Sequence, residues 1–196
     1  MFISFQQASY LTSAFELSQL IADEGKEIAF AGRSNSGKSS AINCLTRQKK
    51  LCKTSKTPGR TQLINFFALD DLHKLVDLPG YGFAKVPKKL RDHWGQVLSR
   101  FLLERNALAG LVIVIDIRRG ISDLDQALID MVENRFPVHI LLTKSDKLSK
   151  LAVAKAKASV KKQLQYDSYT VSCLSVLNRQ GLTELESKCR EWLDFN

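Results

Sequence analysis

The feature that most limits what this chain can fold into is an eight-residue loop between a short apolar run and a helical segment. The loop is Gly32-Arg33-Ser34-Asn35-Ser36-Gly37-Lys38-Ser39, which fits the phosphate-binding pattern of glycine, four residues and Gly-Lys-Ser. Residues 27–31 before it are typical of a buried strand, and residues 39–45 after it of a helix. A chance glycine-rich turn is disfavoured because the full pattern stands between a strand and a helix.

The residue types in this loop suit a phosphate chain. Gly32 and Gly37 let the backbone turn so that successive N–H groups point at an anion, and the helix N-terminus adds partial positive charge. Lys38 offers a cation to the β- and γ-phosphate oxygens, and Ser39 offers a hydroxyl to Mg²⁺. With Ser40 added, the loop predicts a nucleoside triphosphate site, but it does not identify the base.

Length and composition favour an ordinary globular domain. The 196 residues suit a single domain (1–196) in which residues 1–25 form a lead-in, with helical spacing over residues 13–21. No apolar run reaches membrane-spanning length and the N-terminus lacks signal-peptide features, so we expect a cytoplasmic protein without membrane contact. The net charge of +9 favours a polyanionic partner over a merely solvated basic surface.

Residues 46–61 are polar and basic, with little apolar pattern, and we expect a mobile loop there. Thr61 is the candidate for a second protein ligand of Mg²⁺, recruited when a γ-phosphate is present. Thr54 and Thr57 are rivals, but Thr61 stands directly before the next strand, which limits how far it can move. The predicted nucleotide contacts in this region are Gly59, Arg60, Thr61, Gln62 and Leu63.

A hairpin follows, in which residues 62–69 and 74–77 pair and place one antiparallel strand at the sheet edge. It ends in Asp77-Leu78-Pro79-Gly80. Downstream of a phosphate loop, this string predicts that Asp77 holds Mg²⁺ through water and that the Gly80 N–H meets the γ-phosphate. An isolated string of this kind would be an ordinary turn.

The base-reading signal lies later in the chain. Residues 111–116 and 138–142 are typical of buried parallel strands, and the second runs into Thr143-Lys144-Ser145-Asp146. The Asp146 carboxylate can accept two hydrogen bonds from guanine N1–H and N2–H₂, a donor pair that adenine lacks. Lys144 can lie along the base, and Thr143 can join this loop to the phosphate loop.

The remaining elements are four helices and a strand. Helices are expected over residues 88–105 and 123–134, then a basic helix over 148–165 and a last helix over 181–195. A short strand over residues 169–172 separates the last two. Val171, Ser172 and Cys173 stand where a backbone N–H would contact guanine O6.

Longer strings in the sequence carry a resemblance to a known family. They are Gly-Arg-Ser-Asn-Ser-Gly-Lys-Ser-Ser, Thr-Pro-Gly-Arg-Thr-Gln, Asn-Phe-Phe and Asp-Leu-Pro-Gly-Tyr-Gly-Phe-Ala-Lys-Val. The chain resembles, from Ser9 to Trp192, the bacterial EngB (YihA/YsxC) group of P-loop GTPases. It departs from that group at residues 171–173, where two serines are usual, but the contact there is through the backbone.

The resemblance implies a fold and a role. The fold would be a Ras-like α/β domain, with a six-stranded, mostly parallel sheet and helices on both faces. The protein would bind GTP and GDP with Mg²⁺ held by Ser39, Thr61 and Asp77, and would hydrolyse GTP with Lys38, Asn35 and Gly80. It would be a monomeric switch in assembly of the large ribosomal subunit or its precursor, needed for normal cell division and septation.

Two residues refine the expected chemistry. Tyr81 follows Gly80 where a water-orienting glutamine could stand, so we expect slow intrinsic hydrolysis completed by a partner or another group. In related GTPases an asparagine at the position of Asn35 ligates K⁺. Asn35 could equally do no more than support the geometry of the loop.

Alternative functions remain at this point. A P-loop kinase for a small substrate would need an arginine-rich lid, which the sequence does not suggest. A nucleotide-dependent interaction protein of the division site, without a direct ribosomal role, is the other alternative. If the ribosomal role holds, the basic residues predicted to meet rRNA phosphates are Lys49, Lys50, Lys53, Lys88, Lys89, Arg91 and those of the 150–162 helix.

Overall fold

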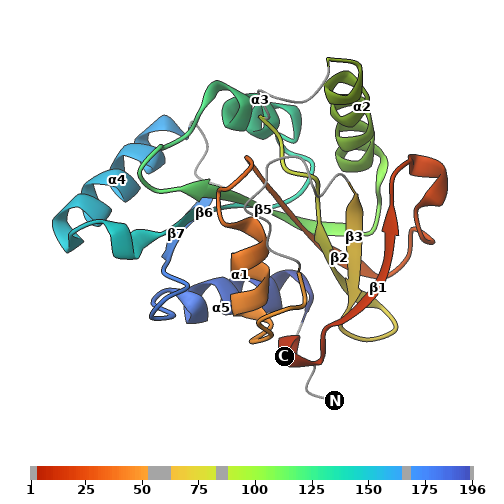
Figure 1. The fold of residues 1–196 in the computed structure, drawn as a ribbon, viewed down its shortest axis with the longest axis horizontal. Coiled ribbons are helices and arrows are strands. Elements are labelled where there is room, and N and C mark those ends of the chain that lie inside the picture. The colour runs from red at the N-terminus through yellow and green to blue at the C-terminus, as the bar shows by residue number, and fades with distance from the viewer. Residues whose placement is uncertain (1–3, 53–62, 83–87, 165–168, 195–196) are drawn as a thin grey trace.

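The computed structural model describes residues 4–52, 63–82, 88–164 and 169–194, apart from the side chains of residues 88–94. In this part of the chain seven strands form one sheet in the order β1-β3-β4-β2-β5-β6-β7 (Figure 1). The strands are β1 (Ser9–Ala14), β2 (Lys26–Gly32), β3 (Ile64–Ala68), β4 (His73–Asp77), β5 (Leu108–Asp116), β6 (Val138–Thr143) and β7 (Thr170–Leu174). The α/β fold with a mostly parallel sheet is confirmed, with seven strands where the resemblance implies six.

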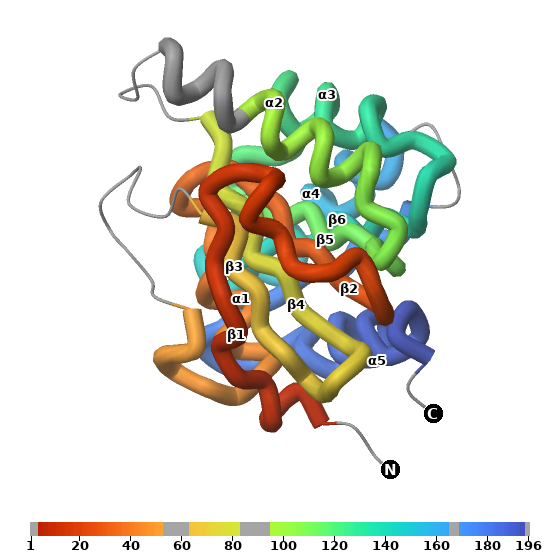
Figure 2. Tube along the Cα trace, turned by 90° about the vertical axis from the view of Figure 1, so that its right-hand side faces the viewer, coloured from red at the N-terminus to blue at the C-terminus, as the bar shows by residue number. Residues whose placement is uncertain are grey.

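The strand β3 runs antiparallel to both of its neighbours, and the other pairings in the sheet are parallel. The predicted hairpin of β3 and β4 is therefore present. The prediction that the antiparallel strand lies at the sheet edge is wrong, because β1 pairs with the outer side of β3 (Figure 2).

The helix predicted over residues 13–21 is also wrong. Ser13 and Ala14 belong to β1, and only Leu17–Gln19 form a short 3-10 turn, η2. The strand is hard to recognise because its first three residues are all exposed and a β-bulge interrupts its pairing between Tyr10 and Thr12. Backbone hydrogen bonds with β3 hold this segment in place, and few of its side chains are buried. The sequence therefore lacks the alternation of apolar and polar residues that marks a half-buried strand.

Helices cover both faces of the sheet and enclose two hydrophobic cores (Figures 1 and 2). The helices are α1 (Lys38–Leu45), α2 (Lys88–Glu104), α3 (Asp123–Met131), α4 (Lys150–Gln163) and α5 (Leu182–Trp192). Alternate residues of β2 face opposite cores: Phe30 belongs to the core that includes α1 and α5, whereas Ala29 belongs to the core that includes α2, α3 and α4. None of the helices within the described residues is long and apolar enough to cross a bilayer.

A buried ion pair between Arg105 and Glu27 holds the segment that precedes β2. The Arg105 guanidinium donates to both carboxylate oxygens of Glu27, at 2.8 and 2.7 Å, and also to the backbone carbonyls of Ile21 and Ala22. Glu27 is fully buried at the start of β2. Removing one member would leave a buried charge unpaired, which typically costs about 3–5 kcal/mol.

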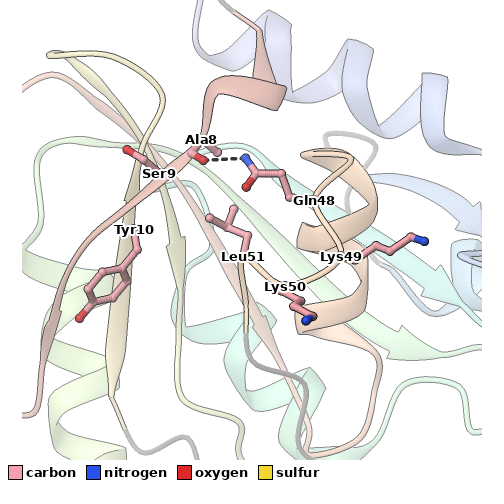
Figure 3. Close-up of a pocket in the computed structure, with 7 residues that line it drawn as sticks. All are labelled: Ala8, Ser9, Tyr10, Gln48, Lys49, Lys50 and Leu51. Carbon is pink, nitrogen blue, oxygen red and sulfur yellow. Dashed lines mark hydrogen bonds between the residues drawn. The ribbon is translucent and has the colours of Figure 1, made fainter.

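A shallow hollow lies where the N-terminal segment meets the chain that follows α1 (Figure 3). Its lining residues are Ala8, Ser9, Tyr10, Gln48, Lys49, Lys50 and Leu51. The Gln48 side-chain amide donates to the carbonyls of Ala8 and Gln6, at 2.6 and 3.0 Å, and so joins the two segments. Lys49 and Lys50 are exposed at its rim.

His139 of β6 is a buried titratable group held by two hydroxyls. Its Nδ1 lies 2.7 Å from Thr170 Oγ1 and its Nε2 lies 2.7 Å from Ser172 Oγ, and the residue is 1% exposed. Burial, with smaller effects from Lys188 and Lys157, lowers the pKa of His139 to about 4. The imidazole is therefore neutral in the folded protein at neutral pH.

We predict that this histidine makes the protein less stable as the pH falls from about 6.5 to about 4. In that window the unfolded chain binds a proton at His139 and the folded chain does not, so the free energy of unfolding falls by up to about 1.4 kcal/mol per pH unit. Denaturant unfolding between these pH values should show a shallower dependence in His139→Gln. Other groups titrate alike in both proteins and cancel in the difference, so equal slopes would contradict the prediction.

Candidate nucleotide-binding site

The carboxyl ends of the parallel strands bring the predicted site residues to one edge of the sheet, where α/β proteins usually bind ligands. Gly32 ends β2, Asp77 ends β4 and Thr143 ends β6. The loop 33–37 follows β2, Lys38, Ser39 and Ser40 form the first turn of α1, and Leu78, Pro79 and Gly80 follow β4. Lys144 precedes the short 3-10 turn η3 (Ser145–Lys147), which contains Ser145 and Asp146.

The phosphate loop has the backbone that its sequence predicts for an anion site. Asn35 and Gly37 have φ values of 62° and 101°, in the left-handed region. Gly37 is the N-cap of α1 and has no side chain to cap it, which leaves the first-turn N–H groups open to a ligand. The Ser36 hydroxyl is buried and has no hydrogen-bond partner among the described residues, and a phosphate oxygen would satisfy it.

Lys38 and Asp77 form a buried ion pair beside this loop. The two residues are 8% and 2% exposed. Charges buried this deeply need partners, and a phosphate chain with Mg²⁺ would supply one to each. The pair therefore places the cation for phosphate next to the carboxylate for the metal.

The donor set fits Mg²⁺ bound together with phosphate oxygens. No group of three or more His, Cys, Asp and Glu side chains that could hold a metal occurs in the described part of the chain. Mg²⁺ needs no such cluster, since it usually takes one or two protein ligands, phosphate oxygens and water. Ser39 and Asp77 are the described candidates. The other candidates and contacts, Thr54, Thr57, Gly59, Arg60, Thr61 and Gln62, lie outside the described residues, and Leu63 lies partly exposed just before β3.

The segment after Asp77 runs alongside the phosphate loop. The Leu78 N–H donates to the Phe30 carbonyl at 3.0 Å, and the Tyr81 N–H donates to the Gly32 carbonyl at 3.3 Å. The Ser34 N–H donates in turn to the Tyr81 carbonyl at 3.0 Å. These bonds hold Gly80 next to the loop, as a contact with the γ-phosphate requires.

Thr143 and Lys144 connect the loop that carries Asp146 to the phosphate loop. The Thr143 hydroxyl hydrogen-bonds with the Ser36 carbonyl. The Lys144 ammonium donates to the Asn35 carbonyl at 2.8 Å and to Asp116 Oδ2 at 2.9 Å. The contact that the sequence predicts between Thr143 and the phosphate loop is therefore present.

Asp116 was missed in the sequence, although it organises this connection. It ends β5, is 3% exposed, and accepts hydrogen bonds from the Arg118 guanidinium at 2.9 and 2.6 Å. Hydrogen bonds from Arg118, and then from Lys144, hold the pKa of Asp116 far below its usual range. The negatively charged Asp116 carboxylate thus holds the Lys144 ammonium next to the Asn35 carbonyl. The signal available was an aspartate ending an apolar strand.

Asp146 presents its carboxylate at the same edge. Ser175 Oγ donates to Asp146 Oδ1 at 3.1 Å, and Lys147 Nζ lies 3.4 Å from Asp146 Oδ2. Burial opposes ionisation, but the hydrogen bonds from Ser175 and Lys147 outweigh it and lower the pKa of Asp146 below its usual value. The group is therefore an ionised acceptor, which suits the adjacent N–H donors of guanine.

The contact of guanine O6 with the backbone at Val171, Ser172 and Cys173 stays a prediction. These residues lie inside β7, which extends to Leu174, and the Ser172 hydroxyl contacts His139. The turn beside Asp146 begins at Ser175, because the strand is longer at this end than its apolar pattern suggests. Counting back from the glycine that begins the last helix would have found this turn.

Comparisons with known proteins agree with this geometry. The model of the family described as "50S ribosome-binding GTPase" matches residues 27–144. The probable GTP-binding protein EngB of Coxiella burnetii is 48% identical over 192 residues, covering 96% of this chain and 94% of that protein. The protein of the same name from Hydrogenovibrio crunogenus is 48% identical over 194 residues, covering 97% and 92%.

The fold comparison points the same way. A crystal structure of a probable GTP-binding protein EngB superposes with a TM-score of 0.68 at 23% identity, covering 87% of this chain and 100% of that one. At this identity the likeness concerns the fold alone, and the assignment to a family rests on the sequence matches. The chain belongs to the EngB family of P-loop GTPases.

Proposed function

We propose that this protein is a cytoplasmic, Mg²⁺-dependent GTPase switch that acts in assembly of the large ribosomal subunit, with its effect on cell division following from ribosome supply. The observation that carries the guanine part is the Asp146 carboxylate. Ser175 holds it at the sheet edge that also carries the phosphate loop. Thr143 and Lys144 join its loop to that phosphate loop.

At the phosphate end, the chain supplies positioned charge rather than covalent chemistry. The N–H groups of the first turn of α1 and the Lys38 ammonium would bind the phosphates, while Asp77 and Ser39 would hold Mg²⁺. Bound Mg²⁺ would neutralise part of the charge on the β- and γ-phosphates. Gly80, held beside the loop by the backbone bonds of Leu78 and Tyr81, would report the γ-phosphate.

Slow intrinsic turnover follows from the residue after Gly80. The Tyr81 hydroxyl donates to Asp125 of α3, so this side chain is committed elsewhere and cannot orient an attacking water as a glutamine would. The missing group would come from a ribosomal partner or from a cation near Asn35.

The proposed ribosomal partner rests on charge and on the description of the matched family model. The chain has a net charge of +9. Helix α4 exposes Lys150, Lys155, Lys161 and Lys162, and the rim of the hollow beside β1 exposes Lys49 and Lys50 (Figure 3). Such lysines can neutralise rRNA phosphates. Lys53, Lys88, Lys89 and Arg91 lie where side chains are not described.

We predict that Asp146→Asn exchanges the base preference. The asparagine amide cannot accept both guanine donors, so the affinity for GTP should fall at least about 100-fold, and the affinity for XTP should rise because the amide can donate to the xanthine 2-carbonyl. Binding of GTP, GDP, ATP and XTP measures this. Asp71→Asn, an exposed aspartate at the tip of the hairpin, is the matched control. Unchanged GTP preference in Asp146→Asn would remove guanine recognition from this residue.

We predict faster turnover in K⁺ than in Na⁺ at equal ionic strength. In Asn35→Gly this difference should disappear, because the proposed side-chain ligand is lost while glycine suits the φ of 62° at this position. Phosphate release in each salt is the measurement. Equal turnover of the unmodified protein in the two salts would show that Asn35 only supports the loop.

We predict that binding to large ribosomal subunits weakens steeply with salt. A plot of log affinity against log salt should become shallower by roughly one for each phosphate contact removed, so Lys161→Gln/Lys162→Gln should reduce the slope. Cosedimentation at several salt concentrations measures this. Lys26→Gln, a lysine that pairs with Asp194 at the other end of the sheet, should leave the slope unchanged. A salt-independent association would rule out the basic surface as the contact.

A further inference from the structure

Three segments of the chain meet at Tyr81. Its backbone lies against the phosphate loop, through the bonds with Gly32 and Ser34, and its side chain reaches α3. The Tyr81 hydroxyl donates to Asp125 Oδ1 at 2.7 Å. The residue thus connects the segment that carries Gly80 with the phosphate loop on one side and with a helix on the other.

Asp125 is a rigid acceptor for this hydroxyl. It is 1% exposed, and its other oxygen accepts from the Ser122 N–H at 2.9 Å and the Ser122 hydroxyl at 2.6 Å. Ser122 and Asp125 form the capping box of α3, and the helix N-terminus favours the negative charge. Burial, and then the neighbouring Asp125, raise the pKa of Tyr81 well above its usual value, so the phenol remains a donor.

The backbone at residue 82 lies beside the same two elements. Gly82 has a φ of 77°, and a Cβ there would lie 3.1 Å from Arg33 Nε and 3.4 Å from Leu124 Cδ1. Arg33 belongs to the phosphate loop and Leu124 to the first turn of α3. Arg33 and Leu124 therefore leave little room for a side chain at residue 82.

We propose that Tyr81 is a positioning residue that sets the preference for GTP over GDP, by anchoring the Gly80 backbone through its hydroxyl on Asp125. The proposal rests on the function proposed above. Gly80 and Tyr81 share a peptide bond, so an anchored Tyr81 limits the positions that the Gly80 N–H can take. The γ-phosphate of GTP contacts this N–H, whereas GDP has no γ-phosphate. Loss of the hydrogen bond between Tyr81 and Asp125 should therefore weaken the binding of GTP and leave the binding of GDP unchanged.

The same linkage runs in the reverse direction. Coupling between sites is reciprocal. A γ-phosphate that binds the Gly80 N–H therefore also affects the conformation of the N-terminus of α3, through Tyr81 and Asp125. Leu124, which is 50% exposed in the first turn of α3, lies at the surface of that region. The nucleotide state would thereby reach a surface outside the nucleotide site.

The test compares Tyr81→Phe with the unmodified protein. The change keeps the partly buried ring and removes only the hydroxyl, so a purely structural role predicts an unaltered ratio of GTP to GDP affinity. Dissociation constants are measured with Mg²⁺ for GDP and for a non-hydrolysable GTP analogue, alongside thermal unfolding. Tyr10→Phe is the matched control, because it removes an exposed tyrosine hydroxyl that hydrogen-bonds to Ser13.

We expect Tyr81→Phe to weaken binding of the GTP analogue roughly fivefold or more, within the usual range of coupling between sites, and to leave GDP unchanged. Asp125→Asn should shift the same ratio in the same direction. The double variant should lose less than the product of the two effects, because both act through one hydrogen bond. Tyr10→Phe should change neither constant.

An unaltered ratio in Tyr81→Phe, or an equal loss of both nucleotides in both single variants, would overturn the positioning role. The proposed function itself would be refuted by a different result, namely that the unmodified protein binds GTP no more tightly than ATP. The two failures are therefore separate. Should Tyr81→Phe unfold at the assay temperature, the ratio in Asp125→Asn decides the question alone.

Discussion

The structure depends on a matched pair of charges enclosed beside the phosphate loop. Lys38 at the start of α1 and Asp77 at the end of β4 are both almost fully buried, and either alone would carry a penalty of several kcal/mol. The register of β2 with β4 sets their proximity, because it aligns Phe30 with Asp77, two residues before the loop begins. The sheet thus delivers a carboxylate to the helix N-terminus that carries the lysine, and a phosphate–metal ligand matches both charges in the same way.

The two ends of the site are held by hydrogen bonds to backbone carbonyls. Thr143 and Lys144 reach the carbonyls of Ser36 and Asn35, so the loop that carries Asp146 is joined to the phosphate loop. Both acceptors are backbone carbonyls. These contacts therefore depend on the backbone conformation of the phosphate loop and not on the side chains of Asn35 and Ser36. Asp116 completes this arrangement from β5, with Arg118 balancing its charge.

Local strings in the sequence were enough to predict the phosphate loop, the Asp77 turn and the Asp146 loop, because each is built from consecutive residues. The contacts that complete the site were harder, since Ser175 meets Asp146 across 29 positions and Asp116 meets Lys144 across 28. Sheet register decides those contacts, and residue type does not encode it. The strand β1 was not predicted for a related reason. Backbone hydrogen bonds to β3 hold it, and it has few buried side chains that would indicate a strand in the sequence. The strand predicted over residues 169–172 ends too early, because β7 extends to Leu174, further than its apolar run indicates.

The bulge in β1 has a consequence for how the edge of the sheet meets other chains. A flat terminal strand offers a row of unpaired amides and carbonyls on which a stranger's extended segment can assemble. The extra residue between Tyr10 and Thr12 breaks that row and bends the margin of the sheet. The bulge therefore makes this edge a poorer template for pairing with a second copy of the chain.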